Sequence, residues 1–326
     1  MSEALRHQAL AERYARFAQD EVHGNSPLYE MICYCVARSD PVLDFIATLP
    51  RERQQPNLFL AALRQVAGVP RDQDALEAAV SAHSESIADL MRSRTTQTNE
   101  CGRCAVLLPL LAQLRQPIAI IEVGAAAGLC LVPDLYGYDY GRVIIEAPEA
   151  CRSIAPVLRC DASPSTPLPT GLPSIVWRAG LDIKPLDVWS AEDMAWLKTL
   201  VWPEQIERQA RLDAAIEVAK SNLIRIERGD LASDLPRLAA AAPPGVPLIV
   251  FHTAVLAYVP DLVVREAFAR TVRDLGAIWI SNEMPEVFPT IAQKVAVQKP
   301  GRFLLAVNGE PKAWTAPHGQ WMEWLR

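Results

Sequence analysis

The sequence predicts an α/β protein in which an all-helical N-terminal domain precedes a doubly wound, mostly parallel sheet. Two observations carry this prediction. Before about residue 115, apolar side chains recur at helical spacing, as at Leu10, Tyr14 and Phe17, and no alternating strand pattern occurs. After it, short apolar runs alternate with helical stretches, which is typical of a parallel sheet with crossover helices. We therefore expect a helical domain at 1–115 and a sheet domain at 116–326.

Each expected element has its own signal. In the first domain, Pro41, Pro56 and Pro70 lie near helix starts. In the second, 117–123 is an apolar run rich in β-branched residues, as expected of a buried parallel strand. The later expected strands are 174–177, 223–226, 248–251, 277–280 and 303–307, with helices at 191–221 and 261–275.

Residues 138–174 do not fit this alternation, because they are rich in proline. We predict that they form an insertion in the sheet domain, with a small extra strand at 143–146. The insertion would be either a lid over a site or a surface excursion.

Composition limits the classes of function. Half of the 326 residues are hydrophobic and 21% are charged, which fits a globular chain. The formal charge of −6 gives no basic excess for nucleic acid or an anionic membrane. The longest apolar stretches, such as 248–259, are too short to span a bilayer, and the N-terminus lacks the apolar core of a signal peptide. We expect a cytoplasmic protein with no nucleic-acid or membrane partner.

The seven cysteines are an odd number in a long chain, which argues against a secreted disulfide framework. Cys101 and Cys104 have the spacing of a redox or zinc pair, and Cys33 and Cys35 could complete a four-sulfur site. Because the flanking sequences are helical, we favour packing roles and predict no metal site.

The residues after the first expected strand carry the sharpest chemical pattern. The strand ends near Glu122, Gly124 permits a tight turn, and Gly128 permits close packing where a helix is expected to begin. The alanines between them, including Ala126, let a ligand approach the backbone. The Gly-x-Gly-x-x-Gly fingerprint of dinucleotide-binding sheets is absent. A nucleoside or nucleotide ligand is expected at this turn.

Acidic residues also follow the next two strands. Asp182 could accept hydrogen bonds from ribose hydroxyls, and Asp230 follows a glycine after the third strand. Alternatively, Asp182 caps a turn or helix, and Asp230 caps the next helix. Three acids at three successive strand ends, counting Glu122, favour the nucleoside site.

Candidate catalytic residues follow the fourth and fifth strands. His252 could take a proton from a nucleophilic substrate, or it could bond a neighbouring loop and shape the pocket. Tyr258 and Glu283 are weaker candidates near strand ends, as are Asn282 and His318.

A polar cluster precedes the sheet. Gln97, Asn99, Glu100 and Arg103 would lie over the cofactor loop, where Arg103 could pair with a carboxylate. The alternative is a helix start, with Thr98 or Asn99 as cap and Glu100 in the first turn.

Two resemblances follow from these residues. Glu122 stands two residues before Gly124, and the glycines are four apart, which resembles motif I of class I S-adenosylmethionine-dependent methyltransferases; Ala126 stands where many members have glycine. This implies that the loop contacts the methionine part and Glu122 its amino group, with Asp182 at the ribose and Asp230 at the adenine amino group. Segments 94–100, 122–129, 180–187, 201–205 and 250–258 resemble a bacterial family of unknown function across nearly the whole chain.

The second resemblance implies a helical N-terminal region joined to a Rossmann-like, class I methyltransferase sheet domain, and it assigns no activity. The expected function is S-adenosylmethionine-dependent methyl transfer to an unidentified small molecule. One alternative is a non-catalytic nucleoside-ligand sensor or scaffold, since no known methyltransferase catalytic tetrapeptide follows the fourth strand. Another is a nucleotide-dependent oxidoreductase, against which the missing third glycine counts.

Overall fold

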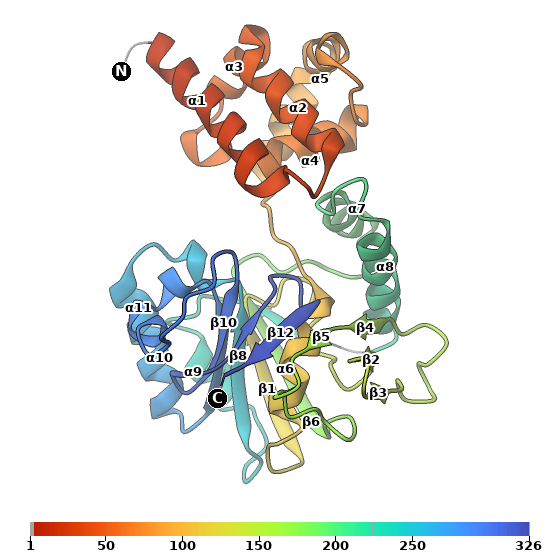
Figure 1. Ribbon diagram of the computed structural model, residues 1–326, viewed down its shortest axis with the longest axis vertical. Helices are drawn as coiled ribbons and strands as arrows, with labels where there is room; N and C mark the ends of the chain where they lie inside the picture. Colours follow the sequence, from red (N-terminus) through yellow and green to blue (C-terminus); the bar gives the residue numbers. More distant parts are fainter. Residues whose placement is uncertain (1–2, 223, 326) are drawn as a thin grey trace. The chain divides into compact units, whose positions relative to one another are not determined.

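The computed structural model describes residues 3–222 and 224–325, and it divides into two compact units. Unit 1 is Met1–Thr98 together with Ala191–Gln209, and unit 2 is Asn99–Ser190 together with Ala210–Arg326. Figure 1 shows that unit 1 is helical and that unit 2 contains the sheet. The polar segment from Asn99 onward is therefore part of the sheet unit, whereas 191–209 groups with the helical one.

Unit 1 consists of helices joined by short turns. Ser26 and Ser39 cap the second and third helices by accepting from Tyr29 N and Val42 N, and Pro41 and Pro56 lie in first turns as expected. The elements are α1 Glu3–Phe17, η1 Ala18–Val22, α2 Pro27–Arg38, α3 Asp40–Ala47, η2 Arg51–Arg53, α4 Pro56–Ala67, α5 Gln73–Ser93, α7 Ala191–Thr199 and the start of α8 Ile206–Lys220.

The α7 segment is part of the core of unit 1. Trp196 is 1% exposed and donates from Nε1 to Thr95 O at 2.9 Å. The single helix expected at 191–221 is wrong, because α7 ends at Thr199 and α8 begins at Ile206. Pro203 lies in the break, where proline disfavours helical geometry at the preceding residue, Trp202.

Unit 2 is built on a large, mostly parallel sheet. Its strand order is β5-β12-β11-β10-β9-β8-β1-β6-β7. The strands are β1 Ile118–Val123, β5 Asp161–Ala162, β6 Ile175–Asp182, β7 Ile226–Arg228, β8 Leu248–Thr253, β9 Ile278–Glu283, β10 Phe303–Val307, β11 Glu310–Thr315 and β12 Trp321–Trp324. The predicted strands are thus present, although β10 is antiparallel to its neighbours. The β7 strand lies later than the expected 223–226, of which residue 223 falls outside the described residues.

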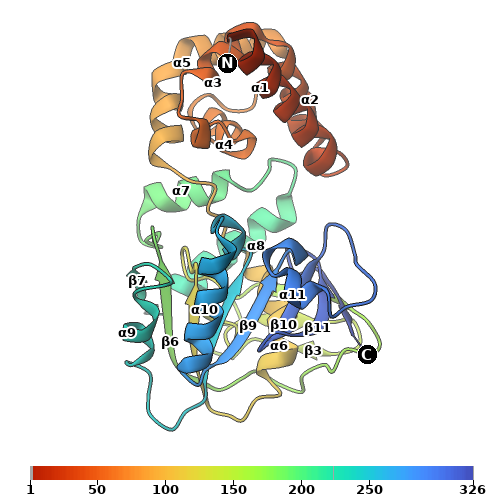
Figure 2. The same cartoon turned by 90° about the vertical axis from the view of Figure 1, so that its left-hand side faces the viewer.

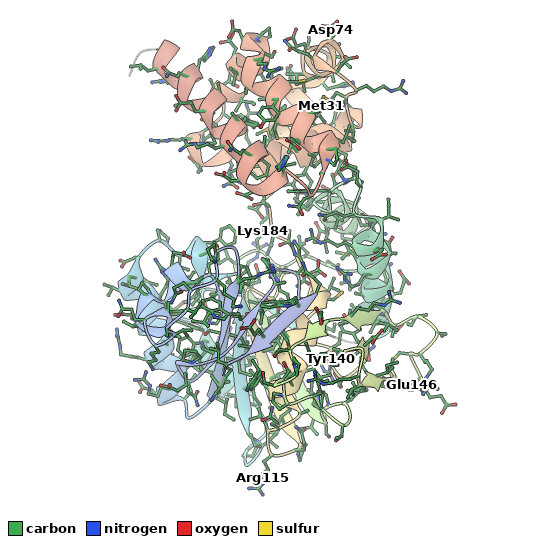
Figure 3. All side chains as sticks on the ribbon, viewed as in Figure 1. Met31, Asp74, Arg115, Tyr140, Glu146 and Lys184 are labelled. Carbon is green, nitrogen blue, oxygen red and sulfur yellow. The ribbon has the colours of Figure 1, made fainter. Side chains whose placement is uncertain are left out.

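The chain changes direction across the sheet at β1. It runs from β1 to β6 and β7 on one side, and afterwards to β8 and β9 on the other, all as parallel neighbours. The loops after β1 and β8 therefore separate at a topological switch point, where ligands bind in open α/β sheets. Figure 3 shows Lys184, just after β6, and Arg115, just before β1, at opposite ends of this unit.

Helices cover the sheet through an apolar core. Ile121 and Val123 of β1 pack in one cluster with residues of α9 Leu235–Ala239, α10 Leu262–Asp274 and α11 Pro289–Ala292. Figure 2 shows α10 lying across this face. Because side chains alternate along a strand, Glu122 faces the other side of the sheet from Ile121 and Val123. The short helices η3 Cys101–Arg103, α6 Cys104–Leu111, η4 Leu256–Tyr258 and η5 Pro285–Val287 complete the unit.

The proline-rich segment forms structure of its own. A small sheet with order β3-β2-β4 contains β2 Gly137–Asp139, β3 Ile144–Ile145 and β4 Val157–Arg159. The extra strand expected at 143–146 is confirmed by β3. The β5 strand extends the large sheet by pairing with β12, which anchors this segment to unit 2. The antiparallel strands β11 and β12 were not predicted.

Among the residues that the structure describes, no helix combines the length and the apolar composition needed to cross a bilayer.

Candidate functional site

The loop after β1 does not begin a helix, so the expected helix N-terminus at this site is wrong. Residues 124–136 form consecutive turns. Gly124, Ala126 and Gly128 have φ of +73°, +49° and +75°. A right-handed helix requires negative φ, so alternate residues in the left-handed region exclude it.

Side chains distant in sequence hold this loop. Asp182 Oδ2 accepts from Ala126 N at 2.8 Å. Asn99 Oδ1 accepts from Ala127 N at 3.2 Å and from Leu129 N at 2.8 Å. The N–H groups of 124, 125 and 128 donate to backbone carbonyls. Every N–H from 124 to 129 is therefore donated within the protein, which leaves none to cradle a phosphate.

The carbonyls that follow are engaged in the same way. Tyr136 Oη donates to Leu129 O at 2.7 Å, and Arg178 Nη1 donates to Leu131 O at 2.9 Å. Arg178 also forms a two-bond pair with Asp134, at 2.7 and 2.8 Å. These partners replace the i to i+4 bonds of a helix, which explains why the expected helix does not form.

The glycines of the loop are packed rather than open. A Cβ on Gly124 would lie 2.4 Å from Val255 Cγ2, and one on Gly128 would lie 2.9 Å from Ile224 Cγ2. Both positions therefore require glycine for close packing as well as for their positive φ.

Asn99 is a testable support of this loop. Its side chain is buried and accepts from two backbone N–H groups, which lie in a non-helical loop and so have no helical carbonyl as acceptor. Asn99→Ala is expected to lower the free energy of unfolding by about 1–3 kcal/mol, because it leaves both donors buried without an acceptor. Urea unfolding measures this change. Asn99→Asp keeps the acceptor and should lose less; equal losses in both variants would contradict the assigned contacts.

Glu122 is the least satisfied polar group of the site. It is 2% exposed, and its Oε2 has no hydrogen-bond partner among the described residues. Burial raises its pKa well above the ordinary value, the nearby Cys130 and Asp182 add to this, and the Arg103 guanidinium opposes it. A buried carboxyl oxygen without a partner costs free energy, so it points to a ligand that is absent here.

Arg103 acts electrostatically on Glu122 and is held by hydrogen bonds to backbone carbonyls. Its Nε donates to Pro317 O at 2.8 Å, and its Nη1 donates to Thr253 O at 2.9 Å. Within the described part of the chain, its Nη2 has no hydrogen-bond acceptor. Arg103 as a whole is 6% exposed. The Nη2 edge of its guanidinium could therefore donate to a ligand at a nearly buried position.

Glu100 fixes the segment that carries Arg103. Its Oε1 accepts from Gly102 N at 3.0 Å and from Arg211 Nε at 3.1 Å. The turn at 316–319 packs against the same segment, because a Cβ on Gly319 would lie 2.0 Å from Gly102 O. Asn99, Glu100 and Arg103 are thus brought together with Glu122 and Asp182 near the carboxyl ends of β1 and β6.

His252 is not placed to act as a base. Its ring is fully buried, its Nδ1 lies 2.7 Å from Glu283 Oε1, and its Nε2 accepts from Trp279 Nε1 at 3.0 Å. Since the indole N–H only donates, Nε2 is the acceptor and Nδ1 carries the hydrogen. Both nitrogens are engaged within the protein, which favours the alternative expectation of a histidine that bonds its neighbours and shapes the pocket.

Glu283 completes this arrangement. Its Oε1 also accepts from Val255 N at 2.9 Å and Leu256 N at 3.1 Å, which fixes the turn after β8. Its Oε2 has no partner in the described residues, and Glu283 lines a cavity of about 10 Å³. That space admits a single water at most, not a substrate. Glu283, expected as a weak catalytic candidate, therefore holds the β8 turn.

The other predicted residues are more dispersed. Tyr258 ends η4 and is 72% exposed. Asp230 is exposed, and its Oδ1 accepts from Ala232 N at 2.8 Å within its own turn. Gln97 is part of unit 1 and accepts from the Thr95 hydroxyl at 3.5 Å.

The cysteines of unit 2 lie mostly in the interior. Burial raises the pKa of Cys101, Cys104 and Cys151, and it also raises that of Cys130, where a hydrogen bond with Cys104 contributes most. Protonated thiols are poor nucleophiles and ligands. In the described part of the chain, all seven cysteines are free and no cluster of three His, Cys, Asp or Glu side chains could hold a metal.

Sequence reasoning missed several contributors. Arg178 is a charged residue inside an otherwise apolar strand, which could have signalled an internal ion pair with Asp134. Thr315 donates to Asn282 Oδ1 at 2.7 Å, and Asn282 Nδ2 is buried without a partner in the described residues. Thr315 and Arg211 carry no local signal, because their partners are distant in sequence.

The fold and the site together define a mixed α/β protein whose mostly parallel sheet carries buried acidic side chains at the carboxyl ends of two adjacent strands. The chain belongs to the family described as an uncharacterized protein conserved in bacteria (DUF2332), whose model matches residues 11–324. The expected resemblance to a bacterial family of unknown function is thereby confirmed. No curated protein and no solved structure matches the chain.

Proposed function

We propose that this protein binds S-adenosylmethionine at the carboxyl ends of β1 and β6 and transfers its methyl group to a small molecule. The observation that carries the proposal is Glu122, whose buried Oε2 has no partner in the described residues and lies beside the loop at the switch point. An ammonium group would satisfy that oxygen and stabilise its charge.

The topology supports the same ligand position. Six strands of the large sheet, β1, β6, β7, β8, β9 and β10, can be numbered 1 to 6 in chain order. Their order across the sheet is then 3-2-1-4-5-6, which is the order of Rossmann sheets. The sixth strand is antiparallel to its neighbour. The order alone supports a ligand at the switch point without choosing the ligand.

Different side chains would bind different parts of S-adenosylmethionine. Glu122 would accept from the amino group of the methionine part, and Arg103 Nη2 would donate to its carboxylate. Asp182, fixed by Ala126 N and Lys184 N, would contact the ribose hydroxyls. The proposed set omits Asp230, since its carboxylate is exposed and holds its own turn.

The oxidoreductase alternative is weaker than the sequence suggested. A dinucleotide needs backbone N–H groups for its diphosphate. In this loop, the N–H groups of 124 to 129 are already donated to Leu181, Asp182, Asn99 and Ala125. An S-adenosyl ligand carries no phosphate, so it does not require them.

Bound S-adenosylmethionine supplies an activated methyl group, and the protein would contribute chiefly by orienting an acceptor and excluding water. His252 and Glu283 are engaged within the protein, so Tyr258 is the exposed candidate near β8. A second function, a non-catalytic sensor of the same ligand, is favoured by the engagement of both His252 nitrogens.

Calorimetric titration with S-adenosylhomocysteine tests the proposal, with NAD as the control ligand. We expect a dissociation constant on the order of micromolar for S-adenosylhomocysteine and no binding of NAD. Glu122→Gln should weaken binding by about tenfold or more, since it removes a charge-assisted hydrogen bond. Glu149→Gln changes an exposed glutamate of the same unit and should leave binding unchanged.

Absence of S-adenosylhomocysteine binding, or equal binding by Glu122→Gln, would contradict the proposed site. Transfer of a labelled methyl group from S-adenosylmethionine to a panel of small nucleophiles separates the two functions. Binding without transfer across the panel favours the sensor, and transfer that falls in Tyr258→Phe supports a catalytic tyrosine.

A further inference from the structure

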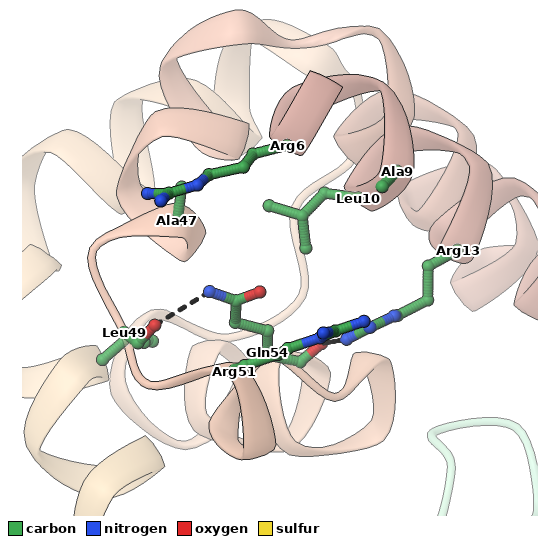
Figure 4. A pocket seen from close by; sticks show the side chains of 8 residues that line it. All are labelled: Arg6, Ala9, Leu10, Arg13, Ala47, Leu49, Arg51 and Gln54. Carbon is green, nitrogen blue, oxygen red and sulfur yellow. Dashed lines mark hydrogen bonds between the residues drawn. The ribbon is translucent and has the colours of Figure 1, made fainter. Parts of the chain in front are cut away.

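Unit 1 contains a concave site lined only by its own residues. A hollow of about 370 Å³ lies between α1 and the segment that joins α3 to α4. Arg6, Arg13 and Arg51 line it, together with Gln54 and the apolar Leu10 and Leu49. Figure 4 shows Arg6 reaching over Ala47 on one side and Arg13 and Arg51 on the side of Gln54. Its volume is within the range of about 300–1,000 Å³ typical of small-molecule sites.

The charge of this hollow is uncompensated within the described residues. None of its arginines forms an ion pair there. Two acids of the neighbouring helices are engaged elsewhere: Asp44 pairs with His7 at 2.8 Å, and Glu12 accepts from Gln8 at 3.0 Å. Guanidinium groups facing one hollow repel each other, and a bound anion would relieve that repulsion.

Part of the rim is fixed in advance. Arg13 Nη1 donates to Gln54 O at 3.1 Å, and Gln54 Nε2 donates to Leu49 O at 2.8 Å. These bonds restrict Arg13 and Gln54, so less conformational freedom is lost when a ligand binds. Arg6 and Arg51 are exposed and can close on a ligand from the open side.

We propose that this hollow binds a phosphorylated small molecule. Phosphate oxygens match the planar fork of arginine, and a phosphate group offsets more of the charge of the three guanidinium groups than a single carboxylate does, with a diphosphate offsetting the most. The apolar floor of Leu10, Ala47 and Leu49 would receive the organic part. The site is separate from that of the S-adenosyl ligand and does not depend on it.

Calorimetric titration of the full-length chain with inorganic pyrophosphate tests the charge recognition. Arg13→Gln and Arg51→Gln should each weaken binding by about tenfold or more, since each loses charge-assisted hydrogen bonds. Arg71→Gln removes one charge from an exposed arginine of the same unit that does not line the hollow, and it should bind as the unchanged chain does. Arg51 is exposed, so its variant should fold normally even if Arg13→Gln is destabilised.

A comparison of phenyl phosphate with inorganic phosphate tests the apolar floor, and phenyl phosphate should bind more tightly. Vesicles containing phosphatidic acid separate a free ligand from a lipid headgroup. Lack of pyrophosphate binding, equal losses in Arg71→Gln, no gain from the phenyl group, or binding to vesicles alone would each overturn the proposal.

Discussion

Replacing Glu283 by alanine is expected to lower the free energy of unfolding by about 3–5 kcal/mol, a loss typical of breaking a buried polar network. One oxygen, Oε1, accepts from His252 Nδ1, Val255 N and Leu256 N. Alanine leaves three donors without an acceptor, those of His252 and Leu256 buried and that of Val255 half-buried. Each buried unpaired donor costs about 1–3 kcal/mol. Urea unfolding of the full chain, followed by circular dichroism and tryptophan fluorescence, measures the change.

Glu283→Gln is the matched variant. Its amide oxygen can still accept at the Oε1 position, so we expect a loss of about 1–2 kcal/mol. His252→Asn should also destabilise, since it breaks the contact with Trp279 Nε1. If Glu283→Ala kept its full stability and abolished ligand binding instead, Glu283 would have to be reassigned to the ligand site.

The sheet was predictable because its signal is local. The strands at Ile118–Val123, Leu248–Thr253 and Ile278–Glu283 each begin with a run of three or four apolar residues, as expected of strands buried on both faces. The antiparallel strands at Glu310–Thr315 and Trp321–Trp324 mix polar and apolar residues. They form through pairing with distant strands, which a short sequence window does not report.

The loop after β1 shows why a local pattern can mislead. The sequence of residues 124–132 predicts a glycine turn followed by a helix, and it contains no helix-breaking proline before Pro133. The outcome is decided by Asn99, Asp182 and Arg178, which bind its backbone groups. Tertiary hydrogen bonds override helix propensity here, because each supplies a partner that the helix would otherwise have provided.

The positions of the candidate site residues follow from the sheet topology, whereas their roles stay predictions. Glu122, Asp182, Asn99 and Arg103 do converge, since parallel strands end at one edge of the sheet. The engagement of His252 with Trp279 and Glu283 depends on the register of β8 against β9, which sequence spacing does not determine. A histidine at a predicted strand end therefore indicates where the side chain lies, but not whether its ring nitrogens are free to contact a substrate.

The second large effect is expected for Glu122→Gln, which should stabilise the ligand-free protein while weakening its binding of S-adenosylhomocysteine. Burial raises the pKa of Glu122 in the folded state, whereas the unfolded chain has the ordinary value of about 4.3. As pH rises above that value, the unfolded chain releases this proton first and the folded chain retains it. The group therefore reduces stability progressively, by up to about 1.4 kcal/mol per pH unit, until pH passes the folded pKa.

Glutamine does not titrate, so this decrease in the free energy of unfolding with rising pH should disappear in Glu122→Gln. It should persist in the exposed control Glu149→Gln. Thermal unfolding followed across pH, without ligand, measures the two slopes. A ligand ammonium would favour the ionised carboxyl, so binding at a pH below the raised pKa of Glu122 should release a proton, which calorimetry in buffers of different ionisation enthalpy detects. If the glutamine variant proved less stable at every pH, Glu122 would be a structural hydrogen-bond acceptor. A stabilised variant that no longer binds would instead identify a residue retained for its ligand at the expense of the fold, as strained functional sites are.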